Sequence, residues 1–180
     1  GQFWLGKNAI SFEEHKSTNE RKSFFDKVYK DIFSLIKKPK RILDLGCGLN
    51  PLTYKAIPFY DKVYFIAVEL TEYDCNNLRE YFKDSGIKGE VIKADVRKGN
   101  NFPAVDVCFM FKLLDTYNIA ESLFSSINTK YFIVSFSTKN VRGIRMNYPR
   151  RGWFERMMKR LGYNYTKLEY SNEVFYVVKK

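Results

Sequence analysis

Short apolar runs alternate with amphipathic helical stretches along most of this chain. The runs are rich in β-branched, leucine and aromatic residues, as buried strands are. Five of them occur at residues 41–45, 63–70, 89–95, 105–111 and 131–137. Helical stretches follow the second run, as far as Gly86, and the fourth run, with apolar residues at 119, 120, 123, 124 and 127. This alternation predicts βαβ units and a parallel sheet with helices on both faces.

The C-terminal part of the chain follows a different order. Residues 153–161 place apolar side chains at 153, 154, 157, 158 and 161, which is the spacing of a helix. Two further strand-like runs, at 163–170 and 173–180, are separated by Ser171 and Asn172, which predicts a tight turn and an antiparallel hairpin. The whole pattern predicts an α/β fold, with a mostly parallel seven-stranded sheet and a C-terminal hairpin, in one domain over residues 1–180.

A helix is also expected ahead of the first strand. In "HKSTNER", Ser17 and Glu20 have the spacing of a capping box, in which each side chain bonds to a backbone amide of the first turn. We therefore expect this helix to begin at Ser17, to carry Arg21 in its first turn and to continue through residues 22–36.

Composition narrows the classes of function. Apolar residues make up 45% of the chain and charged residues 28%, as in soluble globular proteins. We expect a cytoplasmic protein without a membrane partner, because no apolar run approaches the ~20 residues that span a bilayer and the N-terminal residues lack the layout of a signal peptide. A net charge of +11 favours a polyanionic partner, nucleic acid first. Three scattered cysteines and one histidine predict neither disulfides nor a metal site.

The stretch "RILDLGCGLNPL" is typical of a ligand-binding loop at the end of a strand. Gly46 and Gly48 allow a sharp turn and the close approach of a ligand. Asn50 and Pro51 predict a helix start, with Asn50 as the N-cap. The third glycine of the dinucleotide fingerprint is missing, so a pyrophosphate cradle is not indicated. Asp44, the acid ahead of the turn, suits a cationic group of a ligand.

Two further acids end later strands. Glu69 ends the second strand, where a carboxylate can accept hydrogen bonds from both hydroxyls of a ribose. Asp95 ends the third strand, where it can accept from an adenine amino group. The carboxyl ends of parallel strands meet at one edge of a sheet, so Asp44, Glu69 and Asp95 are expected to line one crevice. This set of acids without a phosphate loop points to S-adenosylmethionine.

At these residues the chain resembles a known family. "DLGCG" is similar to motif I of class I S-adenosylmethionine-dependent methyltransferases. "HKSTNER", "ILDLGCGLNPL", "FKLL", "SFSTKNVRG", "NYPRRGWFE" and "NEVFYVV" occur in the order and approximate spacing of the aminoglycoside-resistance 16S rRNA guanine-N7 methyltransferases. The resemblance runs from about His15 to the C-terminus. It implies a Rossmann-like class I fold, S-adenosylmethionine as cofactor, and methyl transfer to guanine N7 in the 16S rRNA of the small ribosomal subunit.

The sequence differs from the family pattern in two main places. Members of the family carry a helical N-terminal region of roughly a hundred residues, whereas about fourteen residues precede His15 here. We expect residues 1–37 to form a helical extension that packs at the cofactor site. Asp115 stands where the family's "FKxLP" motif has proline. These differences leave the target open between 16S rRNA, tRNA and another RNA. The alternative to an enzyme is a non-catalytic module that binds S-adenosylmethionine or RNA.

Methylation at guanine N7 needs no general base. The N7 lone pair attacks the sulfonium methyl directly, so catalysis depends on holding nucleophile, methyl and sulfur in line. The fourth strand ends in "FMFKLL" and lacks the Asn/Asp-Pro-Pro-Tyr/Phe motif of enzymes that methylate exocyclic amino groups. No cysteine takes a position that we can assign to a covalent nucleophile. We expect Lys112 near the target, where a cation meets RNA phosphate.

The motifs and the resemblance together assign two sets of site residues. The cofactor set is Arg21, Asp44, Gly46, Gly48, Glu69, Leu70, Asp95, Val96, Phe111 and Lys112. The RNA set comes from the basic stretch at 137–160 and is Lys139, Arg142, Arg145, Tyr148, Arg150, Arg151 and Trp153. By the resemblance, Arg21 holds the methionine carboxylate of the cofactor together with the helix N-terminus.

Within the RNA set, the roles follow from residue type and position. Tyr148 is expected to stack on a flipped guanine, and Arg142 and Arg145 to clamp phosphate or base. Phe154 and Met157 are assigned to the core face of the last helix. His15 is assigned as a hydrogen-bonded neighbour of the site. Glu173 matches the glutamate of the family's "NELVY" motif and opens the last strand, and its role stays open, with ordering of the loop over the methyl group as one hypothesis.

Overall fold

The computed structural model describes residues 12–99, 101–115, 119–139, 143–146 and 151–180, with side chains from Ser23 onward. Its helices and strands, with η for a 3₁₀ helix, are α1 (Phe12–Ser34), β1 (Arg41–Leu45), η1 (Asn50–Ala56), η2 (Tyr60–Lys62), β2 (Tyr64–Glu69), α2 (Glu72–Ser85), β3 (Gly89–Lys93), β4 (Val105–Phe111), α3 (Ala120–Ser126), β5 (Thr129–Ser137), α4 (Gly152–Leu161), β6 (Asn164–Glu169) and β7 (Glu173–Lys179). Every expected strand is present.

The strands form one mixed sheet in the order β3-β2-β1-β4-β5-β7-β6. Leu43 of β1 pairs in parallel with Ile66 of β2 and Cys108 of β4, whereas β7 runs antiparallel to both β5 and β6. The expected fold class, a mostly parallel sheet with an antiparallel C-terminal hairpin, is therefore confirmed. We call the side where β1 to β5 end the carboxyl edge, and the side where they begin the amino edge.

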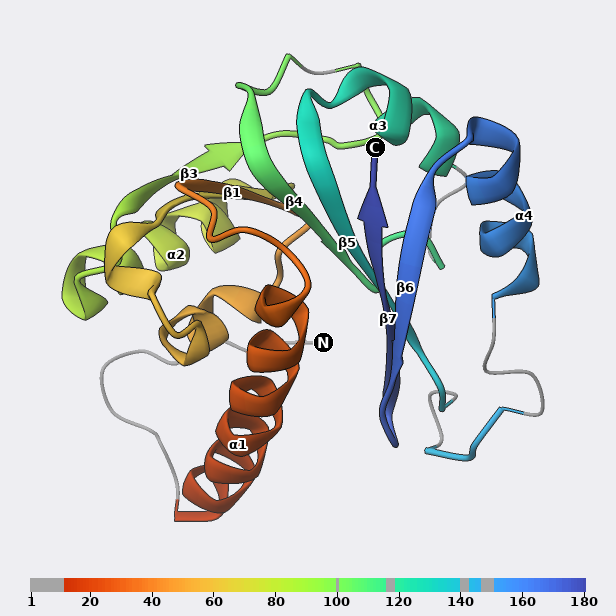
Figure 1. Cartoon of the computed structure of the whole chain (residues 1–180). Coiled ribbons are helices and arrows are strands. Elements are labelled where there is room, and N and C mark those ends of the chain that lie inside the picture. The colour runs from red at the N-terminus through yellow and green to blue at the C-terminus, as the bar shows by residue number, and fades with distance from the viewer. Residues whose placement is uncertain (1–11, 100, 116–118, 140–142, 147–150) are drawn as a thin grey trace.

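Helices cover both faces of the sheet, each over its own apolar core (Figure 1). On one face, α1, η1 and α2 contribute buried side chains that include Tyr29 and Tyr54. On the other face, α3 and α4 contribute buried side chains that include Phe124, Phe154 and Met157. The assignment of Phe154 and Met157 to the core is thus confirmed. The two cores hold the sheet rigid between them, and this rigidity fixes the relative positions of the strand ends.

The first helix begins earlier than expected. Because α1 starts at Phe12, Ser17 lies inside the helix and is not its N-cap, so the capping box at Ser17 and Glu20 is wrong. Arg21 consequently lies in the helix interior and not in the first turn. The same S-x-x-E spacing also occurs at Ser11 and Glu14, directly at the observed start. Spacing alone did not distinguish these two matches.

Two further local expectations are corrected by the structure. The third strand ends at Lys93, so Asp95 lies two residues beyond it and not at its end. The segment after the glycine loop is the 3₁₀ helix η1, its N-cap is Leu49, and no side chain caps it. Asn50 is therefore the first residue of η1 and not its cap. No helix in the described part of the chain is long and apolar enough to cross a membrane.

Gly89 provides a test of how closely β3 approaches β2. A Cβ atom at this position would lie 2.0 Å from the Phe65 carbonyl oxygen, so any side chain forces the two strands apart. We expect Gly89→Ala to lower the free energy of unfolding by about 2 kcal/mol or more, measured by urea denaturation. Gly99→Ala is the matched control, because a Cβ there meets nothing within 4 Å. Equal stabilities of the two variants would contradict this packing.

Candidate cofactor and nucleic-acid site

The glycine loop lies at the centre of the carboxyl edge. Both Gly46 and Gly48 have positive φ angles, 57° and 49°, which side chains of L-residues rarely allow. A Cβ on Gly46 would also lie 2.9 Å from Cδ1 of Leu113, whereas nothing lies within 4 Å of the corresponding position on Gly48. The amide of Cys47 donates to the Val68 carbonyl over 3.0 Å and ties the loop to β2. The loop is thus closely packed at Gly46 and leaves open space at Gly48.

Asp44 is a buried acid with one satisfied and one unsatisfied oxygen. Its Oδ2 accepts hydrogen bonds from Asn50 Nδ2 and from the Tyr54 hydroxyl, each over 2.7 Å. Its Oδ1 is also buried and accepts no hydrogen bond within the described residues. Burial raises the pKa of Asp44 from 3.8 to about 7, although the bonds from Asn50 and Tyr54 oppose this rise. Oδ1 of Asp44 can therefore accept a hydrogen bond from a cationic group of a ligand.

A tyrosine from α1 completes the support of Asp44. The Tyr29 hydroxyl donates to Oδ1 of Asn50 over 3.1 Å and shares a 2.8 Å hydrogen bond with the Thr53 hydroxyl. Asn50 is held in this way from α1 while its amide donates to Asp44. The sequence analysis missed Tyr29 and Tyr54. A hydroxyl in an otherwise apolar, buried stretch is the signal that indicates such a role, because a buried tyrosine hydroxyl usually has a partner.

Glu69 ends β2 beside the glycine loop, as expected. Its Oε2 is buried and has no hydrogen-bond partner within the described residues. Burial raises the pKa of Glu69, while bonds from the backbone amides of Leu70 and Gly48 oppose the rise. Leu70 follows with 46% of its surface exposed and presents an apolar face next to this carboxylate. An acceptor with a free oxygen next to an apolar surface suits the hydroxyls and the base of a nucleoside.

Asp95 lies near these acids but in a different state. The amide of Ala94 donates to the Glu69 carbonyl over 2.9 Å, so the segment after β3 runs alongside the end of β2. The Asp95 carboxylate accepts from Arg97 Nε and Nη2 over 2.8 and 2.7 Å, and these hydrogen bonds lower its pKa to about 2. Asp95 is thus already engaged by an arginine, which the sequence did not predict. Val96, next to it, packs half-buried against the second core.

Lys112 forms an ion pair with the buried Glu173. It follows Phe111, the half-buried last residue of β4, whose ring stacks on Phe109 at 4.7 Å between centroids. Lys112 has a positive φ of 54°, and its Nζ lies 3.0 Å from Oε2 of the buried Glu173. The hydroxyl of Ser135 donates to the other carboxylate oxygen. Glu173, whose role the sequence left open, therefore fixes the ammonium group of Lys112 at the carboxyl edge.

The basic stretch begins with a short β-like segment above the end of β5. Lys139 and Arg145 form an antiparallel bridge, and the amide of Met146 donates to the Thr138 carbonyl over 2.9 Å. Arg145 is exposed, in keeping with its expected contact with RNA. Trp153 is 40% exposed and packs edge-to-face on Phe136. The expected RNA contacts Arg142, Tyr148 and Arg150 lie outside the described residues, as do the side chains of His15 and Arg21.

Arg151, expected to contact RNA, is buried instead. Only 10% of its side chain is exposed, and its Nε and Nη2 each donate over 3.0 Å to one oxygen of Asp115. Nη2 also donates to the Ser137 carbonyl, and the guanidinium lies over the Phe136 ring at 5.3 Å. Arg151 is therefore a structural link between the loop after β4, the end of β5 and the start of α4. Its Nε and Nη2 are engaged within the protein, so the expected contact of Arg151 with RNA stays a prediction.

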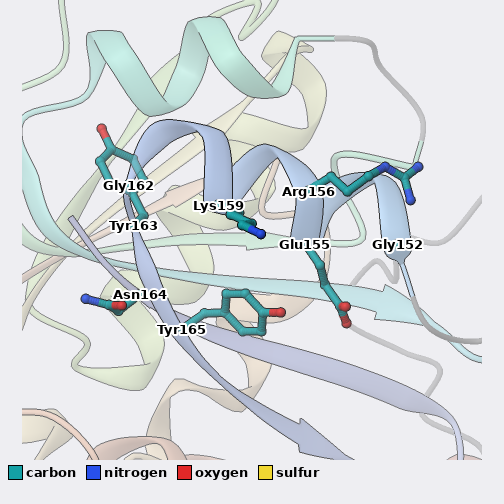
Figure 2. Close-up of a pocket in the computed structure, with 8 residues that line it drawn as sticks. All are labelled: Gly152, Glu155, Arg156, Lys159, Gly162, Tyr163, Asn164 and Tyr165. Atoms are coloured by element: carbon teal, nitrogen blue, oxygen red, sulfur yellow. The ribbon is translucent and has the colours of Figure 1, made fainter.

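A separate groove of about 810 Å³ lies between α4 and β6 (Figure 2). Its lining is Gly152, Glu155, Arg156, Lys159, Gly162, Tyr163, Asn164 and Tyr165. Figure 2 shows Tyr165 of β6 below α4, from which Glu155 and Lys159 project. Asp44, Glu69 and Asp95 do not line this groove, so it is separate from the candidate cofactor site. Within the described residues, no group of His, Cys, Asp and Glu side chains suits a metal ion.

Comparison with known proteins places the chain among methyltransferases of ribosomal RNA. The model of the family described as "Ribosomal RNA methyltransferase (FmrO)" matches residues 7–177. The 16S rRNA (guanine(1405)-N(7))-methyltransferase of Micromonospora rosea is 25% identical over 175 residues, which are 92% of this chain and 63% of that protein. The Serratia marcescens protein of the same name is 28% identical over 185 residues, 97% of this chain and 70% of that protein. The chain thus spans less than two thirds of the length of the Micromonospora relative.

Solved structures give the same result. The 16S rRNA methylase ArmA superposes with a TM-score of 0.72 at 26% identity, over 94% of this chain and 91% of that chain. The 16S rRNA methylase RmtB superposes with a TM-score of 0.71 at 27% identity, over 92% of this chain and 65% of that chain.

The pair of the buried Arg151 and the exposed Asp115 has a measurable cost when the carboxylate is removed. We expect Asp115→Ala to lower the free energy of unfolding by roughly 2 kcal/mol, because it leaves a buried guanidinium without its carboxylate. Glu121→Ala is the matched control, since it removes the exposed 2.7 Å pair with Arg160 and should cost no more than about 0.5 kcal/mol. Chemical denaturation of both variants measures the difference, and equal losses would contradict the structural role of the bond between Asp115 and the buried Arg151.

Proposed function

Because the chain belongs to the ribosomal RNA methyltransferase (FmrO) family, we propose that it transfers the methyl group of S-adenosylmethionine to N7 of a guanine in the 16S rRNA of the small ribosomal subunit. The observation that carries this proposal is the pair of buried carboxylate oxygens, Asp44 Oδ1 and Glu69 Oε2, that have no hydrogen-bond partner in the described part of the chain, beside a glycine loop that is open at Gly48. The curated relatives named above are methyltransferases of this guanine position.

The residues at the carboxyl edge fit S-adenosylmethionine by their chemistry. Glu69 would accept hydrogen bonds from the ribose hydroxyls, and Asp44 would face the ammonium group of the methionine part. Leu70 and Val96 would provide apolar surface for the adenine, whose amino group would reach Asp95. Gly46 and Gly48 would let the loop backbone approach the cofactor. We still propose that Arg21 binds the methionine carboxylate. It would do so from the interior of α1 and not from the first turn of that helix.

The bound cofactor supplies an electrophilic methyl group on a sulfonium, and the protein supplies position. Guanine N7 carries a lone pair in the plane of the base, so no residue has to remove a proton before transfer. Lys112, held by Glu173, presents a cation at the carboxyl edge that would orient the target nucleotide through its phosphate. Arg145 and Trp153 are exposed around the same edge and would bind the RNA next to the target.

The direct test of this function is methyl transfer from tritiated S-adenosylmethionine to small ribosomal subunits, to naked 16S rRNA and to tRNA. We expect label in 16S rRNA, and mass spectrometry of the digested RNA is expected to identify 7-methylguanine. Label found only in tRNA would overturn the rRNA target. A methyl group on N1 or on an exocyclic nitrogen would overturn the proposed chemistry, and failure to bind the cofactor at all would overturn both.

Glu69 separates cofactor binding from folding. We expect Glu69→Ala to lower the affinity for S-adenosylmethionine at least about tenfold, because two hydrogen bonds to a charged acceptor are lost. Stability should be unchanged or higher, since a buried oxygen without a partner is removed with the side chain. Isothermal titration calorimetry and thermal melts measure the two effects. Glu80→Ala, on the exposed face of α2, is the control that should alter neither.

Asp44 predicts a dependence of cofactor affinity on pH. Its pKa of about 7 in the folded chain means that it loses its proton only as the pH rises through 7, and only the ionised form attracts an ammonium group. We therefore expect the affinity for S-adenosylmethionine to rise roughly tenfold between about pH 6 and pH 8. In Asp44→Asn this dependence should disappear and the affinity should be low throughout. A pH dependence that persists in the variant would assign it to another group.

The same shift has the opposite effect on the stability of the free protein. The folded state holds the proton of Asp44 more tightly than the unfolded state, so this group destabilises the fold progressively as the pH rises from about 4 to about 7. Thermal melts without cofactor should show Asp44→Asn losing less stability over this range than the unmodified chain. A parallel decline of the two proteins would contradict the burial of a titrating carboxylate.

A further inference from the structure

The amino edge of the sheet carries a row of lysines, on the side opposite to the cofactor acids. Lys88 directly precedes β3, Lys62 lies two residues before β2, and Lys40 directly precedes β1. Lys130 is the second residue of β5, and Lys179 is the last residue of the antiparallel β7. In the sheet order β3-β2-β1-β4-β5-β7, five of six neighbouring strands therefore place a lysine at the same edge. We call these residues the lysine row.

Backbone hydrogen bonds place members of the row on adjoining strands. The Lys40 carbonyl accepts from the first residue of β2 and the Lys88 carbonyl accepts from its second residue, each over 2.9 Å. On the other side, Lys130 accepts from Lys180 over 3.0 Å. Since neighbouring strands lie about 4.8 Å apart, the row extends over roughly 24 Å. A rigid sheet holds these positions, so the row is a fixed feature and not a chance grouping of flexible loops.

The five lysines of the row outnumber the exposed acids that flank the same strands, which are Asp61, Glu90 and Asp106. All five lysines are exposed, and within the described residues none of them forms a salt bridge. The ammonium of Lys88 donates only to the carbonyl oxygen of Asp61, whose exposed carboxylate is one of the acids at this edge. Asp106 of β4 is another, and its Oδ2 accepts from the amides of Lys40 and Arg41 over 2.7 and 2.9 Å.

The row is far from the site that would hold the target base. In Figure 1, β7 runs upward to the C-terminus at the amino edge, whereas the segment that contains residues 143–146 lies at the opposite end of the sheet. Lys37 and Lys38, between α1 and β1, are also exposed and add to the charge of the amino edge. Exposed cations therefore lie at both edges of the sheet, in addition to those on the helices. An RNA segment bound at the carboxyl edge alone would not reach the lysine row.

We propose that the lysine row is a second RNA-binding surface, which contacts phosphates of the RNA backbone away from the target guanine. The proposal rests on the proposed function only in taking RNA as the partner. Regularly spaced cations without a pocket or a base-stacking platform bind phosphates without reading sequence. Such contacts position a small domain on a large folded RNA, while the carboxyl edge selects the nucleotide.

The test uses a triple variant of the row and a matched triple variant outside it. In the row variant, glutamine replaces Lys62, Lys88 and Lys130. In the matched variant, glutamine replaces three lysines that are exposed on α1, η1 and α4, which are Lys30, Lys55 and Lys159. Affinity for 16S rRNA is measured by filter binding over a series of salt concentrations. For the row variant we expect affinity to fall about tenfold or more at physiological salt, and the slope of log affinity against log salt to become shallower by about two.

Three controls separate this inference from the proposed function. Affinity for S-adenosylmethionine should equal that of the unmodified chain, because the row lies at the edge opposite to the cofactor acids, and the melting temperature should change little, because all three lysines are exposed. The matched variant should lose less than about a third as much affinity as the row variant. Equal losses of affinity in the two variants, or unchanged RNA binding in the row variant, would overturn the inference. Either result would leave the proposed methyl transfer standing. An unmodified chain that does not bind 16S rRNA would overturn the proposed function as well.

Discussion

The arrangement of the carboxyl edge depends on Asp44, a buried carboxylate with hydrogen bonds to only one of its two oxygens in the described part of the chain. Asp44 lies in a central strand, where an isolated charge is costly. Asn50 and Tyr54 satisfy one of its oxygens, and Tyr29 reaches from α1 to hold Asn50 in place. The glycine loop, η1 and α1 are therefore organised around one side chain. The second oxygen, without a donor in the described residues, links the arrangement of the fold to the binding of a cationic ligand.

Two further charged pairs organise the loops that surround this centre. Glu173 brings β7 into the site, because it holds Lys112 directly after β4. Arg151 brings α4 into it, because it binds Asp115 and the Ser137 carbonyl together. The C-terminal helix and hairpin, which form no part of the glycine loop, thus hold Lys112 and Asp115 after β4 and the end of β5.

The division of charge between the two edges follows from the topology of the sheet. In a parallel sheet all strands begin on one side and end on the other, so residues that flank the strands gather at two opposite edges. The buried acids Asp44 and Glu69 lie at the carboxyl edge together with cations such as Lys112 and Arg145. Lysines that directly flank the strands occupy the amino edge, where their spacing is that of the strands. If the proposed RNA contacts of the lysine row hold, selection of the nucleotide and attachment to the RNA backbone take place at opposite edges of the sheet.

The sequence by itself determined the elements and the edge at which the site lies. Strand and helix patterns have periods of two and 3.6 residues, and the glycines of the loop mark a turn that other residues do not allow, so these features are local and can be read from the chain. The number and order of the strands, the positive φ angles of Gly46 and Gly48 and the place of Glu69 all follow from them, although several strand ends do not.

Only the tertiary structure decided which partner each polar side chain takes. Asn50 turns to Asp44 and caps no helix, Asp95 is taken by Arg97, and Arg151 is buried against Asp115, which lies 36 residues earlier in the chain. An arginine in a basic stretch and an arginine in a core have the same sequence signal. Burial and pairing depend on which segments meet in space, and that is settled by the packing of the whole sheet and its helices.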